Sequence, residues 1–186
     1  GNRFYEQWLD ASVTYSSGFY DGTDDLAEAQ RAKYDRVLNR AGITAGANVL
    51  EIGCGWGGFA EAATTVGASI TGVTIAQEQL DYAEKRAAQG GWSHASDFQL
   101  RDFADATGRY DAIVSIEMIE SIEQDRWPEL FDTVARCLKT MGHKGVRRNK
   151  AVRTTLPSKD GNQAGDLLNR DFTAEMRSVR TTAMVY

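Results

Sequence analysis

The sequence predicts an α/β protein whose parallel sheet carries helices on both faces. Two observations support this. Short apolar runs alternate with segments of helical periodicity over residues 1–138, and a glycine-rich turn joins the first such run to the helix that follows it. A chain of 186 residues, 42% of them hydrophobic and 25% charged, is long enough for one domain with its own core. Ligands of such sheets bind above the carboxyl ends of the strands, near the point where strand order reverses.

The elements follow in a regular order. Thr23 can cap a helix from about Asp24 to Arg40, and Gly42 can end it. Strands and helices then alternate, which requires the strands to be parallel. In chain order we expect a strand at 47–53, a helix at 59–66, a strand at 68–74, a helix at 77–91, strands at 97–102 and 110–118, and a helix at 125–139 with Pro128 in its first turn.

Composition excludes several classes. No apolar stretch reaches the roughly 18 residues that would cross a bilayer, and GNRFYEQWLD lacks a signal-peptide layout, so we expect a cytoplasmic protein. Cys54 and Cys137 are too few for a disulfide framework, and neither has a second ligand at zinc-binding spacing. We therefore expect reduced thiols and no metal. His94 falls in a predicted loop and His143 in the tail, so neither is a catalytic candidate.

Charge divides the chain near Lys139. From that residue to the end there are ten Lys/Arg and four Asp/Glu, a balance of +6, whereas residues 1–138 have 11 basic and 22 acidic groups, a balance of −11. The tail also lacks a run that could form a buried strand. A basic tail can contact anionic lipid or nucleic acid, but one this irregular is more often unstructured, and we favour that interpretation and expect no nucleic-acid partner.

The turn EIGCGWGG at 51–58 predicts a ligand site. Gly53 and Gly55 can adopt positive φ or admit a ligand against the backbone, while Gly57 and Gly58 let the next helix begin close to the strand. The spacing fits both the G-x-G-x-x-G pattern of dinucleotide folds and, with Glu51, the acidic-x-G-x-G-x-G pattern of S-adenosylmethionine-dependent methyltransferases. A tight turn without a ligand is the alternative.

Two features favour the second template. A dinucleotide site needs an acid about 20 residues after the turn, where this chain has Gly72-Val73-Thr74, although threonine can still hold a ribose. Glu51 discriminates more strongly, because a like-charge contact with a pyrophosphate at about 4 Å costs about 4 kcal/mol at an effective dielectric near 20. The same acid suits the ammonium of a methionine moiety. We therefore predict S-adenosyl-L-methionine as the cofactor.

Five stretches occur in a restrictive order over about residues 2–139: FYEQWLDASVTYSSGFY, EIGCGWGG, TGVTIAQEQLDYAEKR, RDF and YDAIVSIEMIESI. Together they resemble the cyclopropane-fatty-acyl-phospholipid synthase family, which includes the mycolic acid cyclopropane synthases. The resemblance implies a Rossmann-like class I methyltransferase sheet that transfers a methylene group from S-adenosyl-L-methionine to the cis double bond of an unsaturated acyl chain in phospholipid, giving a cyclopropane ring at a membrane surface. It implies a segment covering the site at 1–22, a cofactor-binding core at 23–139 and an atypical tail at 140–186.

The resemblance also assigns site residues. Glu120 matches a glutamate that helps to hold bicarbonate, thought to be the family's base; Ile116 matches a position lining that pocket, and Ser17 stands where many members have cysteine. The implied cofactor contacts are Tyr15 and Ser16 at the carboxylate end, Glu51, Gly53, Gly55 and Gly57 around the glycine turn, Thr74 and Gln79 at the ribose, and Asp102 and Phe103 at the adenine.

Simpler roles are open for several of these residues. Methyl transfer to an alkene leaves a carbocation that aromatic faces can stabilise, but Tyr15, Phe19 and Tyr20 could instead dock the N-terminal segment. Glu120 could be a solvated residue at a helix start. Asp102 could cap the turn that follows it.

The chain departs from the family pattern after the fourth strand. Ser121 stands where a histidine usually follows the glutamate, and beyond Lys139 the expected Pro-Gly-Gly turn, apolar fifth strand, pocket histidine and pocket tyrosine are absent. We expect a sheet that is incomplete after its fourth strand, with an apolar edge. A reading-frame slip in the gene would account for this tail. The alternative functions are a methyltransferase for another small molecule and an inactive cofactor-binding remnant.

Overall fold

A parallel sheet of five strands organises the part of the chain that the computed structural model describes, which is residues 7, 9–10, 12–139 and 183–185. The strand order is β3-β2-β1-β4-β5, so the order reverses between β1 and β4. The strands are β1 at Asn48–Ile52, β2 at Ser69–Thr74, β3 at Ser96–Leu100, β4 at Ala112–Ser115 and β5 at Ala183–Val185.

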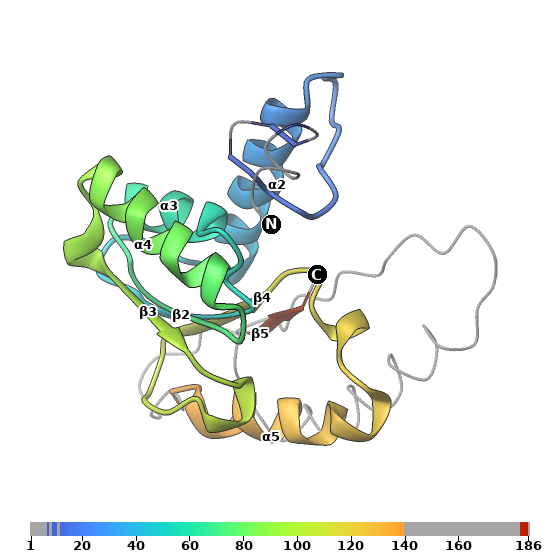
Figure 1. The fold of residues 1–186 in the computed structure, drawn as a ribbon, viewed down its shortest axis with the longest axis vertical. Coiled ribbons are helices and arrows are strands. Elements are labelled where there is room, and N and C mark those ends of the chain that lie inside the picture. Colours follow the sequence, from blue (N-terminus) through green and yellow to red (C-terminus); the bar gives the residue numbers. More distant parts are fainter. Residues whose placement is uncertain (1–6, 8, 11, 140–182, 186) are drawn as a thin grey trace.

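Helices cover both faces of the sheet, which confirms the predicted fold class. The helices are α2 at Leu26–Ala41, α3 at Gly58–Thr65, α4 at Gln77–Gly90 and α5 at Trp127–Cys137. The first three lie on one face and α5 lies on the other, while the N-terminal segment runs beside α2 (Figure 1). Within the described residues, no helix has the length and apolar character needed to cross a bilayer.

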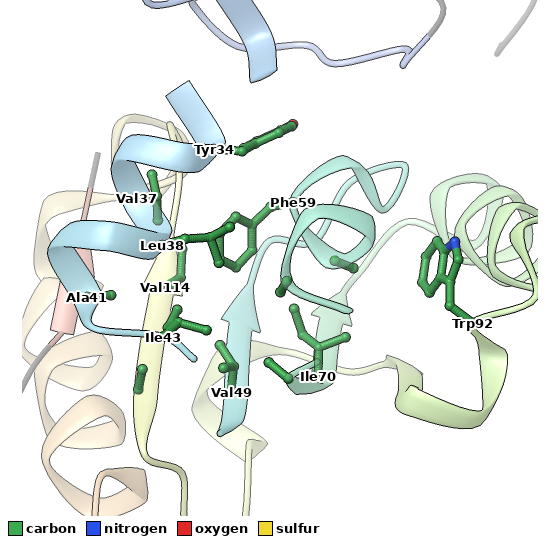
Figure 2. Close-up of a cluster of buried hydrophobic side chains, with 14 of the residues drawn as sticks. Tyr34, Val37, Leu38, Ala41, Ile43, Val49, Phe59, Ile70, Trp92 and Val114 are labelled. Atoms are coloured by element: carbon green, nitrogen blue, oxygen red, sulfur yellow. The ribbon is translucent and has the colours of Figure 1, made fainter. Parts of the chain in front are cut away.

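Side chains of each buried strand alternate between two core clusters. Val49 of β1 joins the cluster under α2 and α3, where the rings of Tyr34 and Phe59 pack edge to face with centroids 5.9 Å apart (Figure 2). Its neighbour Leu50 joins the cluster on the opposite face, together with Leu130 of α5. Burying each large apolar side chain stabilises the fold by roughly 1.5–3 kcal/mol.

The start of α2 differs from the prediction that Thr23 caps it. The N-cap is Asp25, whose carboxylate accepts a hydrogen bond of 2.9 Å from the Glu28 amide. Thr23 instead donates to the Glu28 carboxylate at 2.6 Å. Both residues can cap a helix, and the one that accepts from the third amide of the helix takes the position. Gly42 ends the helix with a φ of 65°, as predicted.

The edge of β4 that faces away from β1 is paired with a short fifth strand, although the sequence predicts a sheet that is incomplete after its fourth strand. Strand β5 pairs with β4 in parallel, with Ile113 opposite Ala183 and Ser115 opposite Val185. It has only three residues, and it satisfies backbone groups that an edge strand would otherwise expose. Residues 140–182, on which most of the predicted irregular tail falls, lie outside the described residues.

Candidate functional site

A pocket of about 690 Å³ opens above the carboxyl ends of the strands. Its walls include the ends of β1 and β2, the turns after β3 and β4, and residues 13–16. The neighbouring strands β1 and β4 are those between which the strand order reverses, which is where the sequence predicts a ligand. The volume lies within the usual range for a small-molecule site.

The glycine turn after β1 has the conformation that its sequence predicts. Gly53, Gly55 and Gly57 have φ values of 79°, 51° and 80°, all in the left-handed region. A Cβ added at Gly55 would meet no atom of the described residues within 4 Å apart from its chain neighbours, so a ligand can approach the backbone there. Gly53 and Gly55 line the pocket, but Gly57 does not: its Cα faces Ala83 of α4, where an added Cβ would lie 3.2 Å from the alanine Cβ.

Glu51 is the buried acid of this pocket. It is 3% exposed, and its Oε2 atom has no hydrogen-bond partner among the described residues. Burial raises the pKa of this carboxyl well above its usual range, and the charges of Lys33 and Arg86 offset the rise only in part. A buried polar atom without a partner is destabilising. A ligand with an ammonium group would supply the missing donors, so the site fits the cationic end of the predicted cofactor.

Tyr15 and Ser16 of the N-terminal segment line the pocket opposite this turn. Two buried side chains of α2 hold Ser16: the Gln30 amide donates to its carbonyl oxygen at 2.7 Å, and the Lys33 ammonium donates to its hydroxyl. Burial lowers the pKa of Lys33 to about 8. The segment is thus fixed to α2 by polar contacts, which the apolar periodicity of the sequence does not show.

The aromatic residues of TYSSGFY do not gather at the pocket. Tyr15 lines it and is 67% exposed. The Phe19 ring lies 4.5 Å from the guanidinium of Arg36 on α2, and neither Phe19 nor Tyr20 lines the pocket. The geometry of Phe19 matches the alternative that these rings dock the segment.

The two residues predicted to contact a ribose lie together. Thr74 at the end of β2 donates a hydrogen bond of 2.8 Å to Oε1 of Gln79 in the first turn of α4, and both line the pocket. This contact fixes the side-chain amide of Gln79 beside the strand end. Both residues therefore line the same pocket as Gly53 and Gly55.

Asp102 lines the pocket and also caps a turn. Its carboxylate accepts from the Ala104 amide at 3.0 Å and forms an ion pair of 2.9 Å with Arg126. The hydrogen bonds from Arg126 hold the pKa of Asp102 below its usual range. Phe103 is buried beneath the Arg126 guanidinium, 4.6 Å from ring centroid to the guanidinium carbon. The predicted turn-capping alternative for Asp102 is confirmed, and it leaves the residue in the pocket wall.

The structure does not bring the three predicted catalytic residues together. Ile116 lines the pocket. Glu120 is exposed in a 3₁₀ turn at Ile119–Ser121 and does not line it. Ser17 is also outside the lining, and its amide donates to the carboxylate of Glu117 at 2.8 Å. The exposure of Glu120 agrees with the solvated alternative.

Sequence reasoning missed Glu117, which lines the pocket directly after Ile116. It is one of two non-glycine residues with positive φ among the described residues, at 45°. Its position just past the end of a buried strand, inside the SIEM motif, was the available signal. The family resemblance instead assigns the catalytic role to Glu120, three residues later.

The parallel sheet, the left-handed glycine turn and the pocket above it define a class I methyltransferase fold, and solved structures of this class share it. One is a cyclopropane synthase from Mycobacterium tuberculosis, with a TM-score of 0.72 and 28% identity over 76% of this chain and 50% of that one. Another is a mycolic acid cyclopropane synthase in complex with SAH and CTAB, with a TM-score of 0.70 and 28% identity over 75% of this chain and 50% of that one.

The chain belongs to the mycolic acid cyclopropane synthetase family, whose model matches residues 1–167. The likeness thus reaches further than residue 139, where we expected it to stop. A tuberculostearic acid methyltransferase of Mycobacterium tuberculosis is 38% identical over 156 residues, covering 78% of this chain and 36% of that protein. A cyclopropane-fatty-acyl-phospholipid synthase of Escherichia coli is 34% identical over 143 residues, covering 76% and 36%. The chain therefore spans little more than a third of these two relatives.

Proposed function

We propose that this chain binds S-adenosyl-L-methionine in the pocket and transfers its methyl carbon to the cis double bond of an unsaturated fatty acyl chain in phospholipid, giving a cyclopropane ring. The observation that carries the proposal is the buried Glu51 carboxylate, which has an unpartnered oxygen among the described residues beside a glycine turn open to a ligand. Family membership and the lipid substrates named for the relatives support the choice of acceptor.

In this proposal, different residues of the pocket bind different parts of the cofactor. Glu51 accepts hydrogen bonds from the amino group, and the bare backbone at Gly53 and Gly55 admits the methionine moiety. In this proposal Thr74 and Gln79 hold the ribose, and Asp102 and Phe103, which line the same pocket, hold the adenine. When bound, the sulfonium would supply an electrophilic methyl group and leave as S-adenosylhomocysteine, and closure of the ring would release one proton of the transferred methyl group. The N-terminal segment, residues 1–22 in this proposal, covers the site.

The acceptor alkene is a weak nucleophile, so the pocket must align it and exclude water. Tyr15 is the one ring of TYSSGFY in the pocket lining, and an aromatic face can stabilise a developing cation by roughly 0.5–2 kcal/mol. Because a phospholipid substrate lies in a membrane, the protein would act at a membrane surface. In this proposal it binds that surface peripherally from the cytoplasmic side.

A bound bicarbonate base does not fit the described residues. Of the three matched positions, Ile116 alone lines the pocket, since Glu120 is exposed and the Ser17 amide is engaged by Glu117. The same observation favours a second candidate function, a cofactor-binding protein without turnover.

Two measurements separate these functions. Calorimetric titration with S-adenosylhomocysteine tests the cofactor site, and mass spectrometry of phospholipids from cells that express the chain tests the acceptor. We expect binding together with acyl chains that gain the mass of one CH₂ group and lose a double bond. Binding without a lipid product would favour the second candidate, and a lack of binding would contradict both.

A further inference from the structure

One hydrogen bond links the N-terminal segment to the end of β4. The Ser17 amide donates to Oε1 of Glu117 at 2.8 Å, across a sequence separation of 100 residues. Glu117 lies in the pocket wall, and Ser17 directly follows two residues that also line it, Tyr15 and Ser16. The contact therefore joins two walls of the pocket that come from opposite ends of the described core.

The backbone of Glu117 is strained in the conformation that makes this contact. Its φ of 45° is left-handed, which a side chain with a Cβ adopts at a cost of about 1 kcal/mol or more. Glycine would adopt the same φ without that cost. Strain of this kind persists where surrounding contacts over-determine the conformation, and the bond to Ser17 is such a contact.

The segment has a second anchor on its other side. Gln30 and Lys33 of α2 both contact Ser16, so adjacent residues of the segment are held by α2 and by the end of β4. The negative charge of Glu117 also acts on the Lys33 ammonium and favours its protonated form. With both anchors in place, Tyr15 and Ser16 are fixed opposite the glycine turn. Without Glu117, the contacts of Ser16 with α2 remain, but the hydrogen bond that ties the segment to the end of β4 is lost.

We propose that Glu117 is a positioning residue for the cofactor site, which fixes Tyr15 and Ser16 opposite the glycine turn by accepting the Ser17 amide hydrogen. This inference rests on the proposed function for the identity of the ligand. A left-handed glutamate serves here because its carboxylate reaches the segment, which glycine at the same φ could not do.

The experiment compares Glu117→Gln, Glu117→Gly and Glu117→Ala in the full chain. Glutamine keeps an acceptor oxygen, glycine removes it without backbone strain, and alanine removes it with the strain retained. Glu84→Gln, at an exposed position of α4 outside the pocket, is the control. For each we would measure the Kd for S-adenosylhomocysteine by calorimetry and the hydrogen-exchange rate of the Ser17 amide in the absence of ligand by NMR.

We expect the glycine and alanine variants to exchange the Ser17 amide at least about tenfold faster and to bind about tenfold more weakly, because a hydrogen bond to a charged group is lost. The glutamine variant should stay within about threefold of the wild type. Glu117→Gly should not unfold more readily than Glu117→Ala, so weaker binding by the glycine variant is not explained by misfolding.

Two results would overturn the inference: unchanged Ser17 exchange in the glycine variant, or faster exchange with unchanged affinity. If the wild type itself fails to bind S-adenosylhomocysteine, the proposed cofactor, and with it the role of Glu117 in positioning that cofactor, is wrong. In that case the exchange data still decide whether Glu117 fixes the segment. The two failures are therefore distinguishable.

Discussion

The pocket has two walls of different construction. We call residues 51–58, which contain the glycine turn, the floor, and residues 13–17 the roof. The floor is one continuous stretch whose shape depends on three left-handed glycines. The roof depends on partners far away in sequence: Tyr34 is 20 residues from Thr14, Gln30 is 14 residues from Ser16 and Glu117 is 100 residues from Ser17.

Because the two walls are built differently, we expect substitutions in them to affect ligand binding differently. Backbone conformation at the floor leaves no room for adjustment, because a side chain there both resists positive φ and fills the ligand's place. The roof is held by several polar contacts, and each such contact contributes only about 1 kcal/mol. A side chain at Gly53 or Gly55 of the floor should abolish binding, whereas loss of one contact of the roof should weaken binding by about tenfold or less.

The largest effect is expected for Gly55→Val. A β-branched side chain would project into the open space above Gly55 and would resist its φ of 51°. We expect affinity for S-adenosylhomocysteine to fall at least about a thousandfold in calorimetric titration, because the ligand and the side chain cannot occupy the same space.

Gly46→Val is the matched control for backbone strain. Gly46 also has a positive φ, of 81°, and within the part of the chain that the structure describes an added Cβ would meet only its chain neighbours within 4 Å, but the residue is outside the pocket lining. This variant should be destabilised to a similar extent and should still bind the ligand. Equal affinities of the two variants would mean that the floor does not contact the cofactor.

A smaller effect concerns Lys33, which supports the roof. Burial lowers its pKa to about 8 from the 10.5 of an unburied lysine, so between pH 8 and 10.5 the unfolded chain binds more protons than the folded one. Stability should therefore rise with pH in this window. The contribution is about 2 kcal/mol between pH 7 and 9.5.

Denaturant unfolding of Lys33→Met at pH 7 and at pH 9.5 tests whether Lys33 causes the rise in stability. The variant should lose the rise, while Lys85→Met, at an exposed position on α4, should keep it. The neighbouring charges of Glu117, Asp10 and Glu51 are present in wild type and variant alike, so the difference isolates the lysine. If the stability of the wild type and that of Lys33→Met depend on pH in the same way, burial does not lower the pKa of Lys33.

The conformation of the floor could be predicted from the local sequence. Family resemblance assigned Tyr15 and Ser16 of the roof to the site, and both line the pocket, but the distant contacts that hold the roof could not be predicted. Continuous apolar runs give the buried parallel strands, and the glycine spacing gives the turn, because both are local properties of the chain. The candidate residues on the strand ends, among them Glu51 and Thr74, follow from the same rule. These predictions needed no knowledge of which distant residues meet.

The missed features all depend on contacts that are remote in sequence or on competition between near neighbours. The Ser17–Glu117 bond, the outward position of Glu120 and the pairing of β5 with β4 have no periodic signature. The N-cap of α2 is Asp25 and not Thr23, because the Asp25 carboxylate accepts the Glu28 amide, whereas the Thr23 hydroxyl accepts the Asp25 amide, which lies before the helix. Sequence resemblance located the acid-containing turn after β4 without showing which of its acids lines the pocket.

The smallest effect is expected where floor and roof touch. Gly58 begins α3, and a Cβ added there would lie 2.6 Å from the Tyr34 hydroxyl and 3.0 Å from the Thr14 hydroxyl oxygen. These two hydroxyls are themselves hydrogen-bonded at 3.0 Å. Gly58→Ala should therefore lower the free energy of unfolding by about 1–2 kcal/mol by overpacking, and Tyr34→Phe by about 1 kcal/mol by loss of the hydrogen bond.

The double variant decides whether the two walls are coupled. Phenylalanine at position 34 lacks the oxygen that the new methyl group would strike, so the alanine should cost less in that background than in the wild type. In denaturant unfolding, we expect the sum of the two single losses in the free energy of unfolding to exceed the loss in the double variant by at least about 0.5 kcal/mol. Strictly additive effects would mean that the close approach of Gly58 to Tyr34 does not affect stability. The floor and the roof would then not be energetically coupled at this contact.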